Sequence, residues 1–220
     1  MEGPMFLTGI SINQLTQIFV REIREGIGGT DIKAGILKAA SDVGGVTEWQ
    51  EKILRAVARA HLLTNVPIML HSCSPKQTGR RQLAILKEEN VKPERVKMDH
   101  SNDTTDIEYL TWLLEQGCYL GMDRYPGFGP VKSHERTRIL KALIDAGYID
   151  RLLPSHDWPL VQIRSDSPAA QQPREREGLR PHGWLYLKKV VFPELREMGL
   201  PESQLDRLCI TGPRNFFEGS

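Results

Sequence analysis

Apolar and polar residues alternate along most of this chain in blocks that predict short strands, each followed by an amphipathic helix. From Ser11 onward apolar residues recur at helical spacing, and Gly28 with Gly29 can end that helix. Short apolar runs typical of strands follow, and the strand-then-helix unit repeats. The predicted strands cover residues 33–38, 66–71, 95–100, 118–124 and 151–157. The predicted helices cover residues 11–29, 47–64, 80–90, 105–117, 133–147, 183–199 and 201–209.

This alternation favours a parallel sheet covered by helices, in the α/β class. The strand ends are spaced much like the units of a (β/α)8 TIM-type barrel, in which roughly 250 residues give about 31 per unit. An open doubly wound sheet also fits the alternation. Residues 1–220 read as a single domain, and the stretch from Pro159 to Pro181, rich in Pro, Ser, Gln and charge, predicts a long loop on the substrate side.

Polar residues stand where the predicted strands end. Ligands gather at the carboxyl ends of the strands in both architectures, so these side chains are candidates for a site. Histidine nitrogen and carboxylate oxygen suit zinc and similar divalent ions. The alternative for each residue alone is a capping or hydrogen-bonding group. The residues are Lys38, His71, His100, Asp123 with Arg124, and Asp157.

Lys38 does not fit this set as it stands, because a protonated ammonium with a pKa near 10.4 repels a divalent cation. Three explanations are open. Lys38 pairs with Asp157, or it is a desolvated catalytic amine, or it has reacted with carbon dioxide to form an anionic carbamate. A carbamate has two oxygens and could bridge two metal ions.

Composition narrows the classes of partner. The chain has 29 basic and 28 acidic residues, so neither nucleic acid nor a membrane is expected to bind it. Cys73, Cys118 and Cys209 are widely spaced with no CxxC pair, which argues against a disulfide framework or a thiolate zinc site. We expect a cytoplasmic protein, since the first residues lack a signal-peptide pattern and no apolar run approaches about 20 residues.

Five motifs in order resemble the phosphotriesterase family of the amidohydrolase superfamily, and its lactonase-like branch in particular. They are AGILK, PIMLHS, DHSNDTTD, GMDRY and SHDW, and the tail FPELREMGLPESQLDRLCITGPRNFF is also similar to the family. The resemblance covers about Ser11 to Phe217.

The resemblance implies a two-metal hydrolase of lactone or organophosphate esters that uses a metal-activated hydroxide. It implies that Lys38 is the carboxylated, carbamate-bearing bridging lysine, that His71 and His100 bind the more exposed metal, and that Asp157 binds the buried metal and takes up the proton. Two divalent metals are expected, with zinc first and cobalt, iron or manganese as alternatives. The substrate would be a small-molecule ester or lactone, and a homodimer is usual in such families.

Further residues acquire expected roles from the same motifs. Asp103 matches a catalytic position associated with proton relay, with the N-cap of the helix at 105–117 as the alternative. Arg124 and Tyr125 are expected to bind substrate at the mouth of the site, although Arg124 could be only an ion-pair partner. His156 should point away from Asp157 and be structural.

One family feature is missing from the sequence: there is no His-x-His pair. Counting by motif, we expect a partial barrel of about strands 4 to 8, with weakened metal binding. A second hypothesis is a catalytically silent barrel fragment that acts as a binding or assembly partner. A third, a lyase using Lys38 as a Schiff-base amine, is disfavoured by the two strand-end histidines.

Overall fold

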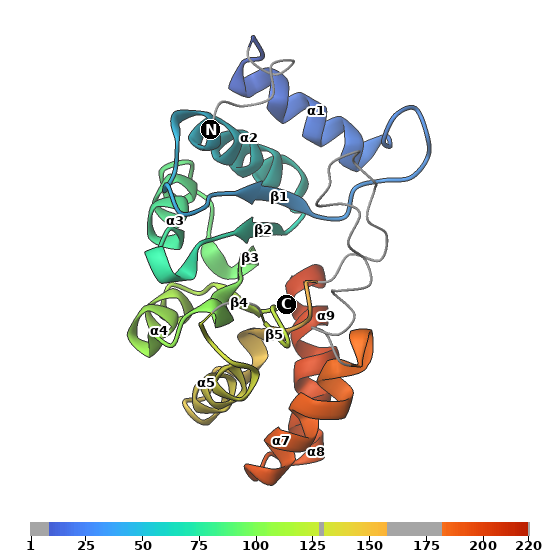
Figure 1. Cartoon of the computed structure of the whole chain (residues 1–220). Helices are drawn as coiled ribbons and strands as arrows, with labels where there is room; N and C mark the ends of the chain where they lie inside the picture. The colour runs from blue at the N-terminus through green and yellow to red at the C-terminus, as the bar shows by residue number, and fades with distance from the viewer. Residues whose placement is uncertain (1–8, 128–129, 158–181, 220) are drawn as a thin grey trace, which may run out of the picture.

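A five-stranded parallel sheet forms the centre of the structure, a computed structural model that describes residues 9–127, 130–157 and 182–219 (Figure 1). The strands lie in chain order, β1-β2-β3-β4-β5, so each strand pairs with the one that precedes it. This arrangement confirms the predicted α/β class. The strands are β1 (Leu37–Ala40), β2 (Ile68–His71), β3 (Val96–Asp99), β4 (Tyr119–Met122) and β5 (Leu152–Pro154).

Helices connect the strands, and further helices precede β1 and follow β5. The two predicted start signals are confirmed, because Ser11 and Thr47 form capping boxes with Gln14 and Gln50. The α-helices are α1 (Ile12–Arg24), α2 (Glu48–Thr64), α3 (Gly79–Glu88), α4 (Ile107–Glu115), α5 (Ser133–Asp145), α7 (Phe192–Glu197), α8 (Glu202–Asp206) and α9 (Gly212–Glu218). Short 3-10 turns cover Ser74–Lys76, Pro93–Arg95, Ser101–Asp103, Ile149–Arg151 and Gly183–Leu185, and π turns cover Leu187–Val191 and Arg207–Thr211.

The sheet has one face covered by helices and one face that carries charge. Helices α2 to α5 lie along the same side of the strands (Figure 1), where alternate strand residues such as Leu70, Met98 and Leu120 are fully buried. The other face carries Lys38 opposite Met69, with Lys97 next in the same row. In a closed barrel this second face would line the interior. Barrel interiors are usually filled by apolar side chains, so the charged side chains here are unusual.

The C-terminal helix α9 covers part of the charged face near the start of the strands. Phe216 packs against Tyr119, with ring centroids 5.2 Å apart, and against Leu153 in a small second apolar cluster. Ile36 joins the same cluster from the segment before β1. The side chain of Arg95 donates to the Phe217 carbonyl at 2.8 Å and anchors the helix to the turn before β3.

Several elements differ from the sequence prediction. Strand β5 ends at Pro154, so Asp157 follows the strand and is not part of it, and helix α9 lies beyond the last predicted helix. Strand β1 does not end at Lys38 but continues to Ala40, because the ladder with β2 extends until the Ser41 amide donates to the His71 carbonyl at 3.0 Å. Lys38 is therefore the second residue of its strand. The expected loop from Pro159 to Pro181 lies outside the described residues.

Among the helices that the structure describes, none combines the length and apolar character needed to cross a bilayer.

Candidate active site

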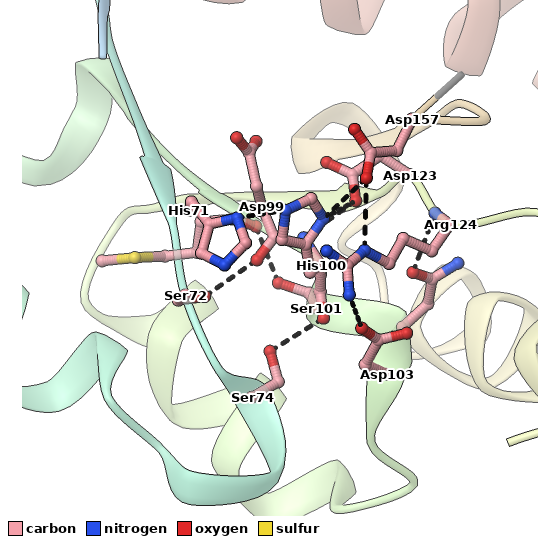
Figure 2. A network of polar contacts seen from close by, with 12 residues as sticks. His71, Ser72, Ser74, Asp99, His100, Ser101, Asp103, Asp123, Arg124 and Asp157 are labelled. Atoms are coloured by element: carbon pink, nitrogen blue, oxygen red, sulfur yellow. Dashed lines mark hydrogen bonds and ion pairs between the residues drawn. The ribbon is translucent and has the colours of Figure 1, made fainter. Parts of the chain in front are cut away.

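Two histidines face each other at the carboxyl ends of adjacent strands (Figure 2). His71 is the last residue of β2, and His100 follows β3 directly. The His71 Nδ1 and His100 Nε2 atoms lie 2.8 Å apart, and the rings meet edge to face at 78°. The two predicted histidines are thus brought together, and one of these nitrogens must carry the hydrogen between them.

Asp123 fixes the orientation of the His100 ring. Its Oδ1 atom accepts from the His100 backbone amide at 2.8 Å and lies 3.0 Å from the ring Nδ1. Burial opposes ionisation, but the hydrogen bond from His100 and the charge of Lys97 outweigh it and lower the pKa of Asp123 below its ordinary value. An ionised carboxylate only accepts, so Nδ1 of His100 is the donor and its Nε2 presents a lone pair to His71.

The loop that carries His100 is held in a strained conformation by neighbouring hydroxyls. His100 has a left-handed backbone with φ 60°, which is costly for a residue with a Cβ. The Ser74 hydroxyl donates to the His100 carbonyl at 2.9 Å, and the Ser72 hydroxyl donates to the Asp99 carbonyl at 2.8 Å. Ser101 adds a bond to the Met98 carbonyl at 2.8 Å. These hydrogen bonds hold the strained backbone of His100 in place, as is common at functional sites.

His71 is kept neutral by its position. Burial, followed by the neighbouring His100 and Arg124, lowers the pKa of His71 below its ordinary value. Its backbone carbonyl accepts from the Gln82 side-chain amide at 2.9 Å, which ties the end of β2 to helix α3. A neutral imidazole is the form that can bind a metal ion.

Lys38 forms an ion pair with Asp99, and not with Asp157 as one of the sequence hypotheses had it. The prediction of an Asp157 partner is wrong for a geometric reason. Lys38 lies at the second position of β1, on the charged face, which it shares with the Asp99 carboxylate at the end of β3. The Lys38 side chain is 45% exposed, whereas that of Asp99 is 2% exposed.

Lys97 continues this row of charges toward His100. Its Nζ lies 3.0 Å from Asp99 Oδ1 and 3.5 Å from Asp123 Oδ2. Burial opposes the charge of Lys97, yet the two carboxylates prevail and raise its pKa. Burial raises the pKa of Asp99, and the two lysines oppose that effect. We call Lys38, Asp99, Lys97 and Asp123 the charged layer.

At the rim of the site, Arg124 joins two carboxylates (Figure 2). Its Nη1 donates to Asp103 Oδ2 at 2.7 Å, and its Nε donates to Asp157 Oδ2 at 3.3 Å. The second oxygen of Asp103 accepts from the fully buried Arg136 at 2.7 Å. Asp157 has a left-handed backbone with φ 48°, its side chain is 51% exposed, and its Oδ2 lies 4.0 Å from His100 Nδ1.

A family model for the phosphotriesterase family matches residues 6–217 of the chain. The chain belongs to the phosphotriesterase family. Its parallel sheet of five strands with flanking helices is consistent with part of the (β/α)8 barrel expected from the resemblance.

Three relatives illustrate the range of the family. The chain is 37% identical over 206 residues to a phosphotriesterase homology protein of Mycobacterium tuberculosis. The matched region covers 93% of this chain and 61% of that protein. It is 33% identical over 217 residues to an aryldialkylphosphatase of Saccharolobus solfataricus, covering 97% and 67%. It is 26% identical over 218 residues to the mouse N-acetyltaurine hydrolase, covering 94% and 59%. The chain therefore spans about three fifths of the length of the first of these relatives.

The donor set of this phosphotriesterase-family chain fits a metal ion in part. The His71 and His100 nitrogens converge, and a carboxylate behind His100 orients its ring, as is usual for metal-bound histidine. Lys38 and Asp157 do not join them, since one pairs with Asp99 and the other with Arg124. Within the described ranges no group of three or more His, Cys, Asp or Glu side chains is placed to hold a metal ion.

Three expectations for individual residues need correction or comment. Tyr125 is 1% exposed and lies in the main hydrophobic core, where burial raises its pKa, so it does not line the mouth of the site. The N-cap of helix α4 is Asp106, whose side chain accepts from the Tyr109 amide, and Asp103 is therefore not the cap. His156 is buried and accepts from the Leu187 amide at 3.3 Å, consistent with a structural role.

Sequence reasoning missed Asp99, Lys97 and Arg136, and gave Asp123 no role beyond its place at a strand end. A partial signal for the first two was present, because residues two apart on a strand share a face and Lys97 and Asp99 have this spacing. A partial signal for Arg136 was also present, because it precedes Leu140 and Leu143 at helical spacing and so falls on the apolar face of its helix.

Proposed function

We propose that this chain carries, at the carboxyl ends of its strands, the site of a metal-dependent hydrolase of phosphotriesterase type that acts on lactone or organophosphate esters. The observation that supports it most is that the His71 and His100 nitrogens converge at the strand ends while the Asp123 carboxylate orients the His100 ring. The name of the Saccharolobus relative, aryldialkylphosphatase, favours aryl dialkyl phosphates as a substrate class. The name of the mouse relative adds an N-acyl amide as a further class to test.

The residues assigned to metal binding follow from this proposal. His71 and His100 would supply two nitrogen ligands to one divalent ion, zinc in the first instance. Lys38 and Asp157 would serve a second ion after Lys38 has left Asp99 and acquired a carbamate. When bound, a divalent ion lowers the pKa of a water molecule and polarises the ester or phosphoryl group.

The chain's own side chains suit the remaining tasks. Arg124 is held at the rim by Asp103 and Asp157, so its guanidinium is oriented to receive the carbonyl or phosphoryl oxygen of a substrate. Asp157 is half-exposed and would accept the proton released by the attacking water. Both oxygens of Asp103 already accept from arginines, which favours a role in holding Arg124.

Metal content and hydrolysis test the proposal together. The protein is purified in bicarbonate-containing buffer, analysed by elemental mass spectrometry, and assayed with a diethyl aryl phosphate, an aryl ester, a lactone and N-acetyltaurine. We expect zinc in the parent, and loss of both zinc and hydrolysis in His71→Ala. His134→Ala is the matched control, because His134 is exposed on helix α5. A parent that binds no metal and hydrolyses none of these compounds would refute the proposal.

A catalytically silent barrel fragment that binds a partner is the second candidate. The observation that favours it is the Lys38 and Asp99 ion pair, which engages the amine that a second metal ion would need. Strands β1 and β5 each pair with one neighbour within the described residues, and such edges can pair with another chain. This candidate predicts no bound metal together with concentration-dependent association in analytical ultracentrifugation, either with a second copy or with another polypeptide.

A further inference from the structure

Lys97 is a buried cation beneath the His100 loop. It lies on the charged face of β3, and its side chain is only 10% exposed. Its Nζ reaches Asp99 at 3.0 Å and Asp123 at 3.5 Å, so one ammonium serves two carboxylates. A lysine is rarely buried to this extent unless such pairing compensates its desolvation. In the sheet register Lys97 alternates with the buried Met98 and shares a row with Lys38, so it belongs to the charged face.

Asp123 divides its two oxygens between Lys97 and His100. Oδ1 accepts from the His100 backbone amide and contacts the ring Nδ1, while Oδ2 faces the Lys97 ammonium. This division fixes the rotation of the carboxylate. Without the cation, Oδ2 would be left buried without a charge partner, and the carboxylate would gain a reason to turn away from the ring.

Gly121 leaves the space in which Lys97 and Asp123 meet. A Cβ at this position would lie 2.8 Å from Lys97 Cε and would collide with the Asp123 carboxylate. The backbone of Gly121 has no positive φ, so the requirement for glycine here comes from the close approach of these side chains. Strand β4 is therefore shaped around the Lys97 and Asp123 contact.

We propose that Lys97 is a positioning residue for His100: through Asp123 it holds the ring in the Nδ1–H tautomer, which leaves the Nε2 lone pair, directed at His71, as the atom that can bind a ligand. The part of this inference that concerns metal affinity rests on the proposed function. The part that concerns the tautomer concerns the metal-free protein alone. Outer partners of metal-bound histidines change metal affinity by about 10- to 100-fold when they are removed.

Long-range 1H–15N NMR of the histidine rings tests the tautomer directly in chelator-treated protein at pH 8. The six histidines give few signals, and a His100→Gln variant assigns the one of interest. We expect a single Nδ1–H tautomer for His100 in the parent and a mixture of both tautomers in Lys97→Met. Lys97→Arg keeps the cation and should restore most of the single tautomer. Lys92→Met, an exposed lysine before the same strand, is the matched control and should match the parent.

Zinc titration by calorimetry provides the second measurement. We expect Lys97→Met to bind zinc about 10- to 100-fold more weakly than the parent. A parent that binds no zinc would count against the proposed function, while the NMR result would still decide the positioning role. If Lys97→Met does not fold by circular dichroism, Lys97→Gln and Gly121→Ala are measured in its place. An unchanged single tautomer in a folded Lys97→Met protein would overturn the inference.

Discussion

Replacing the buried Arg136 by Met should destabilise the protein strongly. Arg136 is 1% exposed and donates to three acceptors: the Val131 carbonyl, the Asn102 carbonyl and the Asp103 carboxylate. Methionine keeps much of the volume but donates nothing, so two buried carbonyls lose their partner and Asp103 keeps only Arg124. Breaking a buried charged pair costs about 3 to 5 kcal/mol. We take about 3 kcal/mol, because Asp103 retains one arginine.

Urea unfolding followed by circular dichroism measures this loss. With an m-value of about 2 to 3 kcal/mol/M, the midpoint should fall by roughly 1 M. Arg138→Met is the matched control, since Arg138 is exposed on the same helix, and it should shift the midpoint by less than about 0.2 M. A midpoint for Arg136→Met within that same narrow range of the parent would refute the argument that Arg136 holds the Asn102 and Asp103 loop.

Three further predictions concern the core, a helix start and acid stability. Leu113→Ala should cost about 2 to 5 kcal/mol in urea unfolding because Leu113 is fully buried, whereas Leu62→Ala, at an exposed site, should be nearly neutral. Thr47→Ala removes the N-cap of α2 and should cost about 1 kcal/mol, measured in the same way. The hydrogen bond from Arg59 lowers the pKa of Glu89, so its stabilising contribution is present above about pH 4.5 and is lost as the pH falls through the lowered value. The difference in urea midpoint between parent and Glu89→Gln should therefore shrink from pH 7 to pH 3, and a constant difference would contradict the assignment.

The fold was largely predictable because its signals are local. Apolar runs of strand length and helices with clear start residues follow one another, and Ser11 and Thr47 cap the helices that their sequences predict. Polar residues at strand ends led to His71 and His100, since parallel strands bring their carboxyl ends to one edge. The pairing of these two histidines is therefore a consequence of topology that the sequence already contains.

The charged layer was not predictable for a physical reason. Lys38 and Asp99 are 61 residues apart and come from strands that are not adjacent, so no local pattern links them. The burial of Arg136 depends likewise on contacts with Asn102 and Asp103, which reach it only after the chain has folded. The predicted end of the first strand was wrong by two residues. Ala39 and Ala40 after Lys38 have no clear preference for strand or loop, so the sequence did not show that the strand continues.

The small apolar cluster of Ile36, Tyr119, Leu153 and Phe216 has a consequence for the order in which the protein is made. Its members are scattered from the first strand to the last helix, so on the ribosome Tyr119 and Leu153 emerge long before Phe216. They remain uncovered until helix α9 is synthesised and docks. The sheet can assemble earlier from neighbouring strands, but its charged face acquires this apolar cover last, and a nascent chain stalled before residue 216 would expose an aromatic surface to chaperones.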